Sequence, residues 1–340
     1  MKLDPVIQNA IVARANRAPS VHNTQPARWA FDDGGVQIYA DEGRFLEVGD
    51  PTLQDAGLSC GGALEGTLMA LVEHGIKANE IEDCWNTPAA LSKGPYKGMR
   101  LAAKITLGKG GVADPLSEFV EQRFTWRGAF EASTDTADFL QWAEAKDDIT
   151  LVSEASSIAE LAALNDVASV KFFKNRAYRE ELLSFMRLSK KHPLWDQDGL
   201  NRESMHLSAF EGGAANIVLR HPVFEIANKL GLSKALVSEA AKTKTATAVA
   251  FFTVPQATSP IDMGRAFYRR WLEITQLGYA VWPMAVLADD KEINALCCKT
   301  YELPSARKLI NVFRIGRVPT GASVPPARLS GTDLILSAES

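Results

Sequence analysis

Two apolar segments of similar design stand far apart in this 340-residue chain. The first begins Gly61-Gly62-Ala63-Leu64 and continues to Gly75, and the second begins Gly264-Arg265-Ala266-Phe267 and continues to Gly278. Each combines an apolar run with a final glycine, where helices commonly end. The repetition predicts an internal duplication into two related halves, each with one such helix, and the glycines would let a helix pack closely.

The composition is ordinary for a soluble globular protein and fits either an enzyme that acts on small molecules or a binding protein. Hydrophobic residues make up 46% of the chain and charged residues 23%. The net charge of −4 provides no basic field for nucleic acid. The four cysteines, which include the adjacent pair Cys297-Cys298, match neither a disulfide framework nor a zinc site.

The start of the chain carries no apolar signal segment. It reads Met1-Lys2-Leu3-Asp4-Pro5, and no run of about 18 apolar residues follows. We therefore expect a cytoplasmic protein without membrane contact. At this length one large or two medium domains are expected.

The pattern of apolar residues divides the chain near residue 114. In the first half it predicts helices over 5–17 and 57–75 and strands over 36–39 and 99–107. In the second half it predicts helices over 115–127 and 264–278, a helix opened by a capping box at residues 157–160, and strands over 149–152, 246–254 and 309–318. Residues 174–222 show little periodicity and are expected to form an insertion or lid. We therefore assign residues 1–113 and 114–340 to two halves.

A stiff polar segment near the start is the first candidate binding element. It reads Ala18-Pro19-Ser20-Val21-His22-Asn23-Thr24-Gln25-Pro26. Its prolines disfavour a helix, and its side chains offer neutral hydrogen-bonding groups. The candidates to contact a flat polar ring or a polyol are Pro19, Ser20, Asn23 and Gln25.

A second candidate element reads Arg123-Phe124-Thr125-Trp126-Arg127. In an extended chain alternate side chains point to one side, so Arg123, Thr125 and Arg127 would face a common ligand. A guanidinium group makes paired, charge-assisted hydrogen bonds to phosphate. The two segments together suit a ligand with a flat polar ring system at one end and a phosphate at the other.

Both segments resemble the flavin-binding motifs of the nitroreductase family. In that family an Arg-x-Ser/Thr-x-Arg segment holds the phosphate and ribityl chain of FMN, and an Ala-Pro-Ser-x-x-Asn-x-Gln-Pro-Trp-x-Phe segment lies against the ring. The order of the two segments is reversed here, which resembles the Acg-type branch with two tandem halves. The tryptophan that follows Gln-Pro in the family is Ala27 in this chain, and Trp29 comes two places later.

The resemblance implies an α+β fold in which two nitroreductase-like halves form a pseudo-dimer, with mainly antiparallel sheets and central helices. Because each half retains one motif, we expect one FMN per chain, bound between the halves. The resemblance also implies a basic residue near the C-terminus that contacts FMN. Arg328 is the first candidate for it and Arg317 the second, and Trp282 is expected near the flavin.

The implied activity is that of an FMN-dependent oxidoreductase, which passes electrons from NADH or NADPH to a small electron-poor acceptor. No catalytic residue is predicted, because the flavin itself carries this chemistry. An alternative within the same branch is a protein that only sequesters FMN, with residues 174–222 as its lid. A chain that completes its own site needs no partner, so we expect a monomer or a weak homodimer.

A distant third interpretation comes from Gly57-Leu58-Ser59-Cys60-Gly61, which fits the Gly-x-Ser-x-Gly motif of α/β-hydrolases. That motif requires a strand directly before the serine, and residues 49–56 do not resemble one. The sequence contains no dinucleotide fingerprint, no nucleotide-binding P-loop and no zinc-protease motif.

Overall fold

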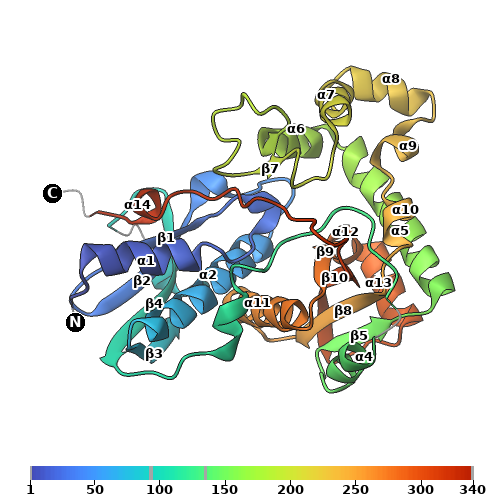
Figure 1. Cartoon of the computed structure of the whole chain (residues 1–340). Helices are drawn as coiled ribbons and strands as arrows, with labels where there is room; N and C mark the ends of the chain where they lie inside the picture. Colours follow the sequence, from blue (N-terminus) through green and yellow to red (C-terminus); the bar gives the residue numbers. More distant parts are fainter. Residues whose placement is uncertain (1, 92–94, 134–135, 338–340) are drawn as a thin grey trace.

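The computed structural model describes residues 2–91, 95–133 and 136–337. Two four-stranded sheets lie on either side of a pair of long helices (Figure 1). Shorter helices surround the second sheet and extend above the helix pair. The fold is α+β with mainly antiparallel sheets, so the predicted fold class is confirmed.

The first sheet comes from the N-terminal half. Its strands, in order across the sheet, are β1 (Ala27–Phe31), β2 (Gly35–Asp41), β4 (Met99–Lys109) and β3 (Ile76–Asp83). All neighbouring strands are antiparallel. β1 and β2 form a hairpin, in which the Asp32 carboxylate accepts hydrogen bonds from the N–H groups of Gly34 and Gly35.

The second sheet repeats this arrangement. Its strands, in order, are β5 (Ile149–Val152), β8 (Ala248–Pro255), β10 (Arg307–Gly316) and β9 (Ala280–Pro283), all antiparallel. In both sheets the fourth strand along the chain lies between the second and the third. A long helix connects the second strand to the third in each half: α2 (Gln54–Glu73) and α11 (Pro260–Gln276). The two halves are therefore related in topology, as the repeated helices predicted.

α2 and α11 cross in backbone contact at two glycines. A Cβ atom added to Gly264 would lie 1.9 Å from the carbonyl oxygen of Leu58, and one added to Gly61 would lie 2.0 Å from that of Ile261. Only glycine allows such an approach. The prediction of a closely packed central helix pair is thus correct.

Each sheet packs on its own hydrophobic core. In the first, Trp29 is fully buried, and its indole N–H donates to the Thr67 hydroxyl of α2 at 2.9 Å. In the second, Phe313 of β10 packs on Phe267 of α11 with ring centroids 5.2 Å apart. The sheets are therefore fixed to the two central helices, and the space between the halves is defined by the helix crossing.

α1 (Pro5–Ala15) begins where the Asp4 carboxylate accepts from the Val6 N–H, with Pro5 in the first turn. Further helices outside the segment 174–243 are α3 (Pro88–Leu91), α4 (Ala137–Glu144), α5 (Ala155–Lys174), α12 (Val286–Asp289), α13 (Lys291–Thr300) and α14 (Gly331–Leu334). Short 3₁₀ turns are η1 (Val21–Asn23), η2 (Glu42–Arg44) and η3 (Pro115–Phe119). None of the described helices is long and apolar enough to cross a membrane.

Two predictions of local structure are wrong. The helix predicted over 115–127 is limited to η3, because a turn at residues 120–122 ends it and Thr125 then pairs with Val281 of β9. The capping box predicted at residues 157–160 is absent, since α5 already begins at Ala155. In the first case a contact with a distant strand determines the structure, and in the second the helix starts before the predicted capping residues.

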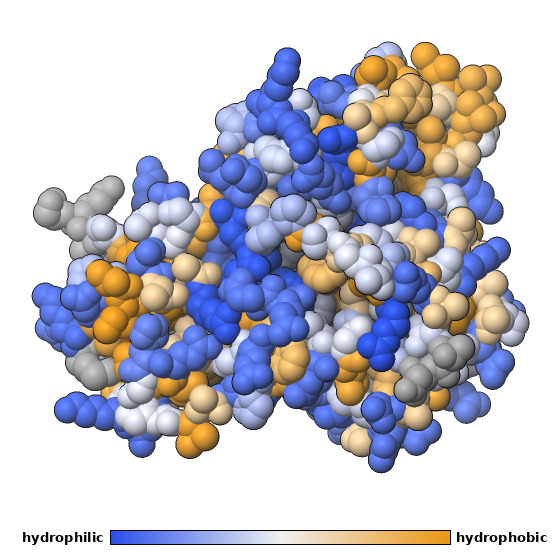
Figure 2. All heavy atoms as spheres, in the orientation of Figure 1, coloured by the Kyte–Doolittle hydropathy of each residue, from blue (hydrophilic) through white to orange (hydrophobic). Residues whose placement is uncertain are grey.

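The segment expected to be an insertion or lid, residues 174–222, contains two helices, α6 (Arg176–Ser184) and α7 (Ala209–Val218), and a short parallel pair, β6 (Met186–Arg187) and β7 (Leu200–Asn201). Three further short helices follow it: α8 (Val223–Lys229), α9 (Ser233–Val237) and α10 (Ala240–Thr243). Large apolar side chains gather on the outer surface of α7 and α8 (Figure 2, upper right), among them exposed Phe210, Ile217 and Ile226. Its role as a lid stays a prediction.

The C-terminal tail leaves the second half and returns to the first (Figure 1). The Leu336 N–H donates to the Trp29 carbonyl at 2.7 Å, and α14 packs on α1. The division of the chain between residues 113 and 114 stays a prediction. Because of the tail, however, the first half contains residues from both ends of the chain.

Candidate functional site

A cavity of about 700 Å³ lies between the two halves. This volume is in the usual range for small-molecule and cofactor sites. The wall includes parts of both halves and of the helical insertion, within the ranges 17–23, 46–58, 121–127, 165–239, 267–289 and 323–328, together with Asn311.

The polar segment 18–26 forms a strained loop on this wall. His22, Asn23 and Gln25 have φ angles of 44°, 55° and 48°, in the left-handed region that residues other than glycine rarely adopt. Such strain persists only where the surroundings impose it, and it is common at functional sites. Of the predicted residues in this loop, Pro19, Ser20 and Asn23 line the cavity.

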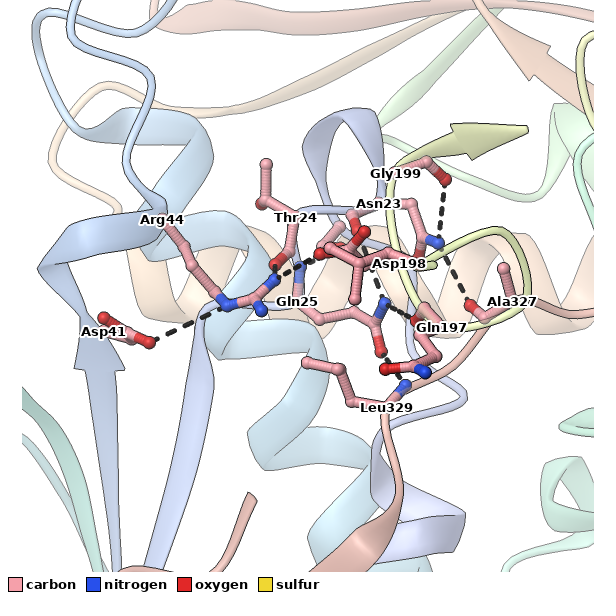
Figure 3. Close-up of polar contacts among 12 residues, drawn as sticks. Asn23, Thr24, Gln25, Asp41, Arg44, Gln197, Asp198, Gly199, Ala327 and Leu329 are labelled. Carbon is pink, nitrogen blue, oxygen red and sulfur yellow. Dashed lines mark hydrogen bonds and ion pairs between the residues drawn. The ribbon is translucent and has the colours of Figure 1, made fainter. Parts of the chain in front are cut away.

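Gln25 does not line the cavity. Its side chain is buried, and its Oε1 atom accepts from the Asn16 amide at 2.8 Å and from the Leu329 N–H at 2.9 Å (Figure 3). Its Nε2 atom donates to the Gln197 carbonyl at 2.8 Å. Gln25 therefore joins three distant segments of the chain, in place of the direct ligand contact that we expected.

Asn23 also joins distant segments of the chain, but unlike Gln25 it lines the cavity. Its Nδ2 atom donates to the carbonyl oxygens of Gly199 at 3.1 Å and Ala327 at 3.0 Å (Figure 3). Asp198, next to Gly199, is buried and accepts from Arg187 at 2.7 Å and from Arg44 at 3.0 Å. This network of contacts explains how the strained loop keeps its conformation.

Three guanidinium groups converge on the cavity, from Arg17, Arg123 and Arg328. Burial, with the charges of Arg123 and Arg17, lowers the pKa of Arg328 to about 9. Burial also lowers the pKa of Arg123 to about 10, so both groups remain cationic at neutral pH. The carboxylate beside them is that of Glu121, which pairs with Arg17 at 2.8 Å. The cluster therefore carries excess positive charge.

The cluster also contains a free buried donor. The Nε atom of Arg123 is buried and has no hydrogen-bond partner within the described part of the chain. The Nη2 atom of Arg123 donates to the Arg17 carbonyl at 2.9 Å, and its Cζ atom lies 4.7 Å from the ring centroid of Trp271. Arg328 is held in place by donation to the Asn16 carbonyl at 2.7 Å and to Asn23 Oδ1 at 2.8 Å. An anion here would meet preoriented donors.

Arg127 faces another part of the wall. Its Nη1 atom donates to the Ser204 carbonyl at 2.9 Å, and burial lowers its pKa to about 10. Burial and the nearby Arg127 charge lower the pKa of His22 to about 4, so this imidazole is neutral, and its buried Nδ1 atom has no partner among the described residues. Trp282 lines the cavity as well, with the fully buried guanidinium of Arg314 3.6 Å from its ring centroid.

The two candidates for the C-terminal basic residue differ in position. Arg317 lies outside the cavity, where its Nη1 atom donates to the Gly278 carbonyl at 3.1 Å and its guanidinium covers Tyr279. Arg328 reaches the cavity because the tail crosses back to the first half. The structure therefore favours Arg328 over Arg317.

Several polar wall residues have no counterpart in the sequence predictions: Arg17, Asp55, Trp271, Asp289 and Asn311. Arg17 directly precedes the polar segment, and that position is the one signal that could have indicated it. The others belong to no motif in the sequence, so no local pattern marks them as wall residues.

The hydrolase interpretation is contradicted by the structure. Ser59 lies inside α2, with no strand before it, and is 2% exposed. Its hydroxyl donates to the Asp55 carbonyl at 2.7 Å and accepts from the Val21 N–H at 3.2 Å. A serine held in this way is not a nucleophile at an exposed turn.

Comparison with known proteins gives local sequence matches. No model of a known protein family matches the chain. The Mycobacterium tuberculosis H37Rv protein named "Putative NAD(P)H nitroreductase acg" is 40% identical over 74 residues, which are 22% of each chain. A second protein of that strain, Rv3131, carries the same description and is 37% identical over 75 residues. The chain thus spans about a fifth of the length of the curated relatives that it matches.

Solved structures show weak overall similarity. A "putative nitroreductase" from Anabaena variabilis is 10% identical, with 94% of this chain and 90% of that chain covered and a TM-score of 0.43. The FMN-dependent nitroreductase NfnB from Mycobacterium smegmatis, solved with NADPH, is 18% identical, with 64% and 96% covered and a TM-score of 0.37. The sequence matches confirm the predicted resemblance to Acg-type nitroreductases over the matched segment.

Proposed function

We propose that this protein is an FMN-binding oxidoreductase of the nitroreductase type, with one FMN per chain in the cavity between the halves. The observation that carries the proposal is the cluster of Arg17, Arg123 and Arg328, which presents excess positive charge to the cavity. Buried charge of one sign is costly unless it is compensated. A phosphate dianion supplies the missing charge and accepts from these donors.

The rest of the wall fits the other parts of FMN. The loop with Ser20 and Asn23 offers small polar groups, and Trp271 and Trp282 offer flat apolar surfaces for a ring system. Thr125 is fixed beside Val281 by the backbone bridge to β9 and lines the cavity, so its hydroxyl is available to a ribityl chain. The donor set therefore fits a molecule with a phosphate, a polyol and an aromatic ring.

The protein would contribute binding, orientation and electrostatics. FMN, when bound, supplies hydride and single-electron chemistry. Arg123 and Arg328 would hold the phosphate, and the neutral imidazole of His22 is available to exchange a hydrogen bond with the ligand. We propose NADH or NADPH as the electron donor and a small electron-poor compound as the acceptor.

The phosphate assignment can be tested with Arg123→Ala and a matched control, Arg317→Ala, since Arg317 is an arginine of the same half outside the cavity. Loss of hydrogen bonds to a charged group should cost about 1.5–3 kcal/mol, or about 10–150-fold in the Kd for FMN. Titration of FMN fluorescence measures both variants, and circular dichroism checks that they fold. Equal FMN affinity of Arg123→Ala and the unaltered protein contradicts the assignment.

One measurement distinguishes an oxidoreductase from a protein that only stores FMN. Storage is the second proposal because the tail at residues 323–328 and the helical insertion both contribute to the cavity wall and could enclose the flavin. Mixing the loaded protein with NADPH or NADH without oxygen should bleach the flavin absorbance if it is an oxidoreductase. Persistent colour supports storage, and a load of two flavins per chain contradicts the single shared site.

A further inference from the structure

Apolar side chains are concentrated on the outer surface of α7, α8 and α9 (Figure 2, upper right). Of the thirteen large apolar residues that are exposed in the described part of the chain, seven lie within residues 210–236. We call the six most exposed of these the apolar patch: Phe210, Ile217, Ile226, Leu230, Leu232 and Leu236. Single exposed apolar residues are normal on a protein surface, whereas a gathering of this kind indicates an interaction site.

The patch is a second apolar face, separate from the core of this region. Phe210 and Ile217 are seven residues apart on α7, and Ile226 and Leu230 are four apart at the end of α8, so each pair shares one side of its helix. The inward side of α8 carries Phe224, which is fully buried. The core is therefore complete without the patch, and no described part of the chain covers it.

The charged residues around the patch leave positive charge free. Residues 209–244 contain five basic and three acidic residues, although the whole chain has a net charge of −4. The three carboxylates are all bound within the chain: Glu211 accepts from the Ser208 N–H, Glu225 pairs with Arg179, and Glu239 pairs with Lys242. Lys229 and Lys234 are exposed and have no hydrogen-bond or ion-pair partner in the part of the chain that the structure describes.

The combination of apolar and free basic side chains fits an anionic phospholipid surface. Lys229 directly precedes Leu230, and Lys234 lies between Leu232 and Leu236 in the sequence. In the membrane interface, apolar side chains enter the region of the acyl chains while lysines contact the anionic headgroups. A second copy of the chain fits less well, because a two-fold contact would bring the same lysines of both copies together.

We propose that the apolar patch, with Lys229 and Lys234, docks this protein on a bilayer that contains anionic phospholipid. Leu236 also lines the cavity between the halves, so the docked surface adjoins the cavity wall. The proposal does not depend on the proposed FMN chemistry. It replaces the expectation of no membrane contact, which rested on the lack of a long apolar run, because a helix that lies in the interface needs no spanning segment.

Sedimentation of the full chain with lipid vesicles tests the docking. The probes are vesicles of phosphatidylcholine alone and vesicles of phosphatidylcholine with about 30% phosphatidylglycerol. We expect the protein to bind the anionic vesicles at least about tenfold more strongly. This difference should decrease at about 0.5 M salt, because salt screens the attraction between the lysines and the headgroups.

Two double variants separate the charged and apolar contributions. Lys229→Gln with Lys234→Gln should weaken binding to the anionic vesicles by about 10–30-fold. Ile226→Ser with Leu230→Ser should weaken it by at least about tenfold, because two apolar side chains no longer enter the bilayer. All four side chains are exposed, so both variants are expected to fold, which circular dichroism checks.

Matched controls lie elsewhere on the surface. Lys109→Gln with Lys299→Gln removes the same charge from two exposed lysines, one at the end of β4 and one on α13. Val112→Ser removes an apolar side chain that is 90% exposed outside the patch. Both controls should bind the anionic vesicles as the unaltered protein does.

The outcomes decide between lipid and other occupants of the patch. Absence of vesicle binding, equal binding to both kinds of vesicle, or unchanged binding in both double variants contradicts the docking. An equal loss in the lysine control also contradicts it, because binding would then follow the overall charge. A dimer in analytical ultracentrifugation that Ile226→Ser with Leu230→Ser dissociates, without vesicle binding, assigns the patch to a second copy and refutes the lipid proposal.

Discussion

The crossing of α2 and α11 allows a stability prediction at the level of single atoms. Gly264→Ala would place a Cβ atom 1.9 Å from the Leu58 carbonyl oxygen and 2.9 Å from the Gly61 Cα atom. Real Cβ atoms do not approach this closely, and the obstructing atoms belong to the backbone of a buried helix. The two helices must therefore separate by more than a side chain could accommodate.

The expected cost follows from two opposing effects. Overpacking a close contact costs about 1–3 kcal/mol, and the upper end applies where neither backbone can yield. Replacing glycine by alanine inside a helix returns about 1 kcal/mol. We therefore expect Gly264→Ala to lower the free energy of unfolding by about 2 kcal/mol, measured by urea denaturation with an unchanged m-value.

Gly62 provides a matched control on the facing helix. A Cβ atom there would contact Ala18 at 3.6 Å and the Pro19 carbonyl at 3.7 Å, which are ordinary van der Waals distances. Gly62→Ala should therefore stabilise the protein by up to about 1 kcal/mol. If Gly264→Ala and Gly62→Ala change the stability equally, the close crossing is wrong. Since Leu58, Phe267 and Trp271 of these helices line the cavity, Gly264→Ala should also weaken FMN binding.

Two further predictions concern buried carboxyl groups. The pKa of Asp55 in the folded protein, about 7, is raised above its usual value. The folded protein therefore binds more protons than the unfolded chain, and the free energy of unfolding should fall by up to about 4 kcal/mol between about pH 4 and pH 7. Asp55→Asn should flatten this slope in thermal unfolding, and a stability that rises over this range contradicts the assignment. Glu65 of α2 is buried and accepts from Arg265 at 2.9 Å and Arg269 at 2.8 Å. Glu65→Ala should lower the free energy of unfolding by about 2 kcal/mol, measured by urea denaturation. Glu82→Ala, at an exposed ion pair, should lower it by less than about 1 kcal/mol. Equal losses in the two variants would refute a larger contribution from the buried ion pairs of Glu65.

Much of the fold is predictable because its main elements have strong local signals. α2 is a long apolar helix and α11 an amphipathic one, each followed two residues later by a glycine, and β4 and β10 carry the apolar patterns of buried strands. β3 was not predicted, since most of its side chains face solvent and its residues Ile76–Asp83 are largely polar. Its pairing with β4 determines its structure, and a strand of this kind has no pattern of its own.

In the site, too, local sequence motifs predicted some wall residues, whereas contacts between distant segments were not predictable. The sequence placed Ser20 and Asn23 of the polar segment, and Arg123 and Arg127 of the arginine segment, in a binding site, and the structure brings all four to one cavity. It did not indicate that Gln25 bonds to Gln197 and Leu329. Those partners come from the insertion and the tail, whose paths only tertiary contacts define.

The position of the tail explains how a duplicated fold can carry a single, asymmetric site. The two sheets have the same strand order, yet the polar loop belongs to one half and the arginine segment to the other. Arg328 joins them, since it donates to the Asn16 carbonyl and to Asn23 Oδ1 while it lies beside Arg123. A ligand held by Arg123 and Arg328 would therefore also stabilise the strained loop and the tail, because all three are connected through the same guanidinium group.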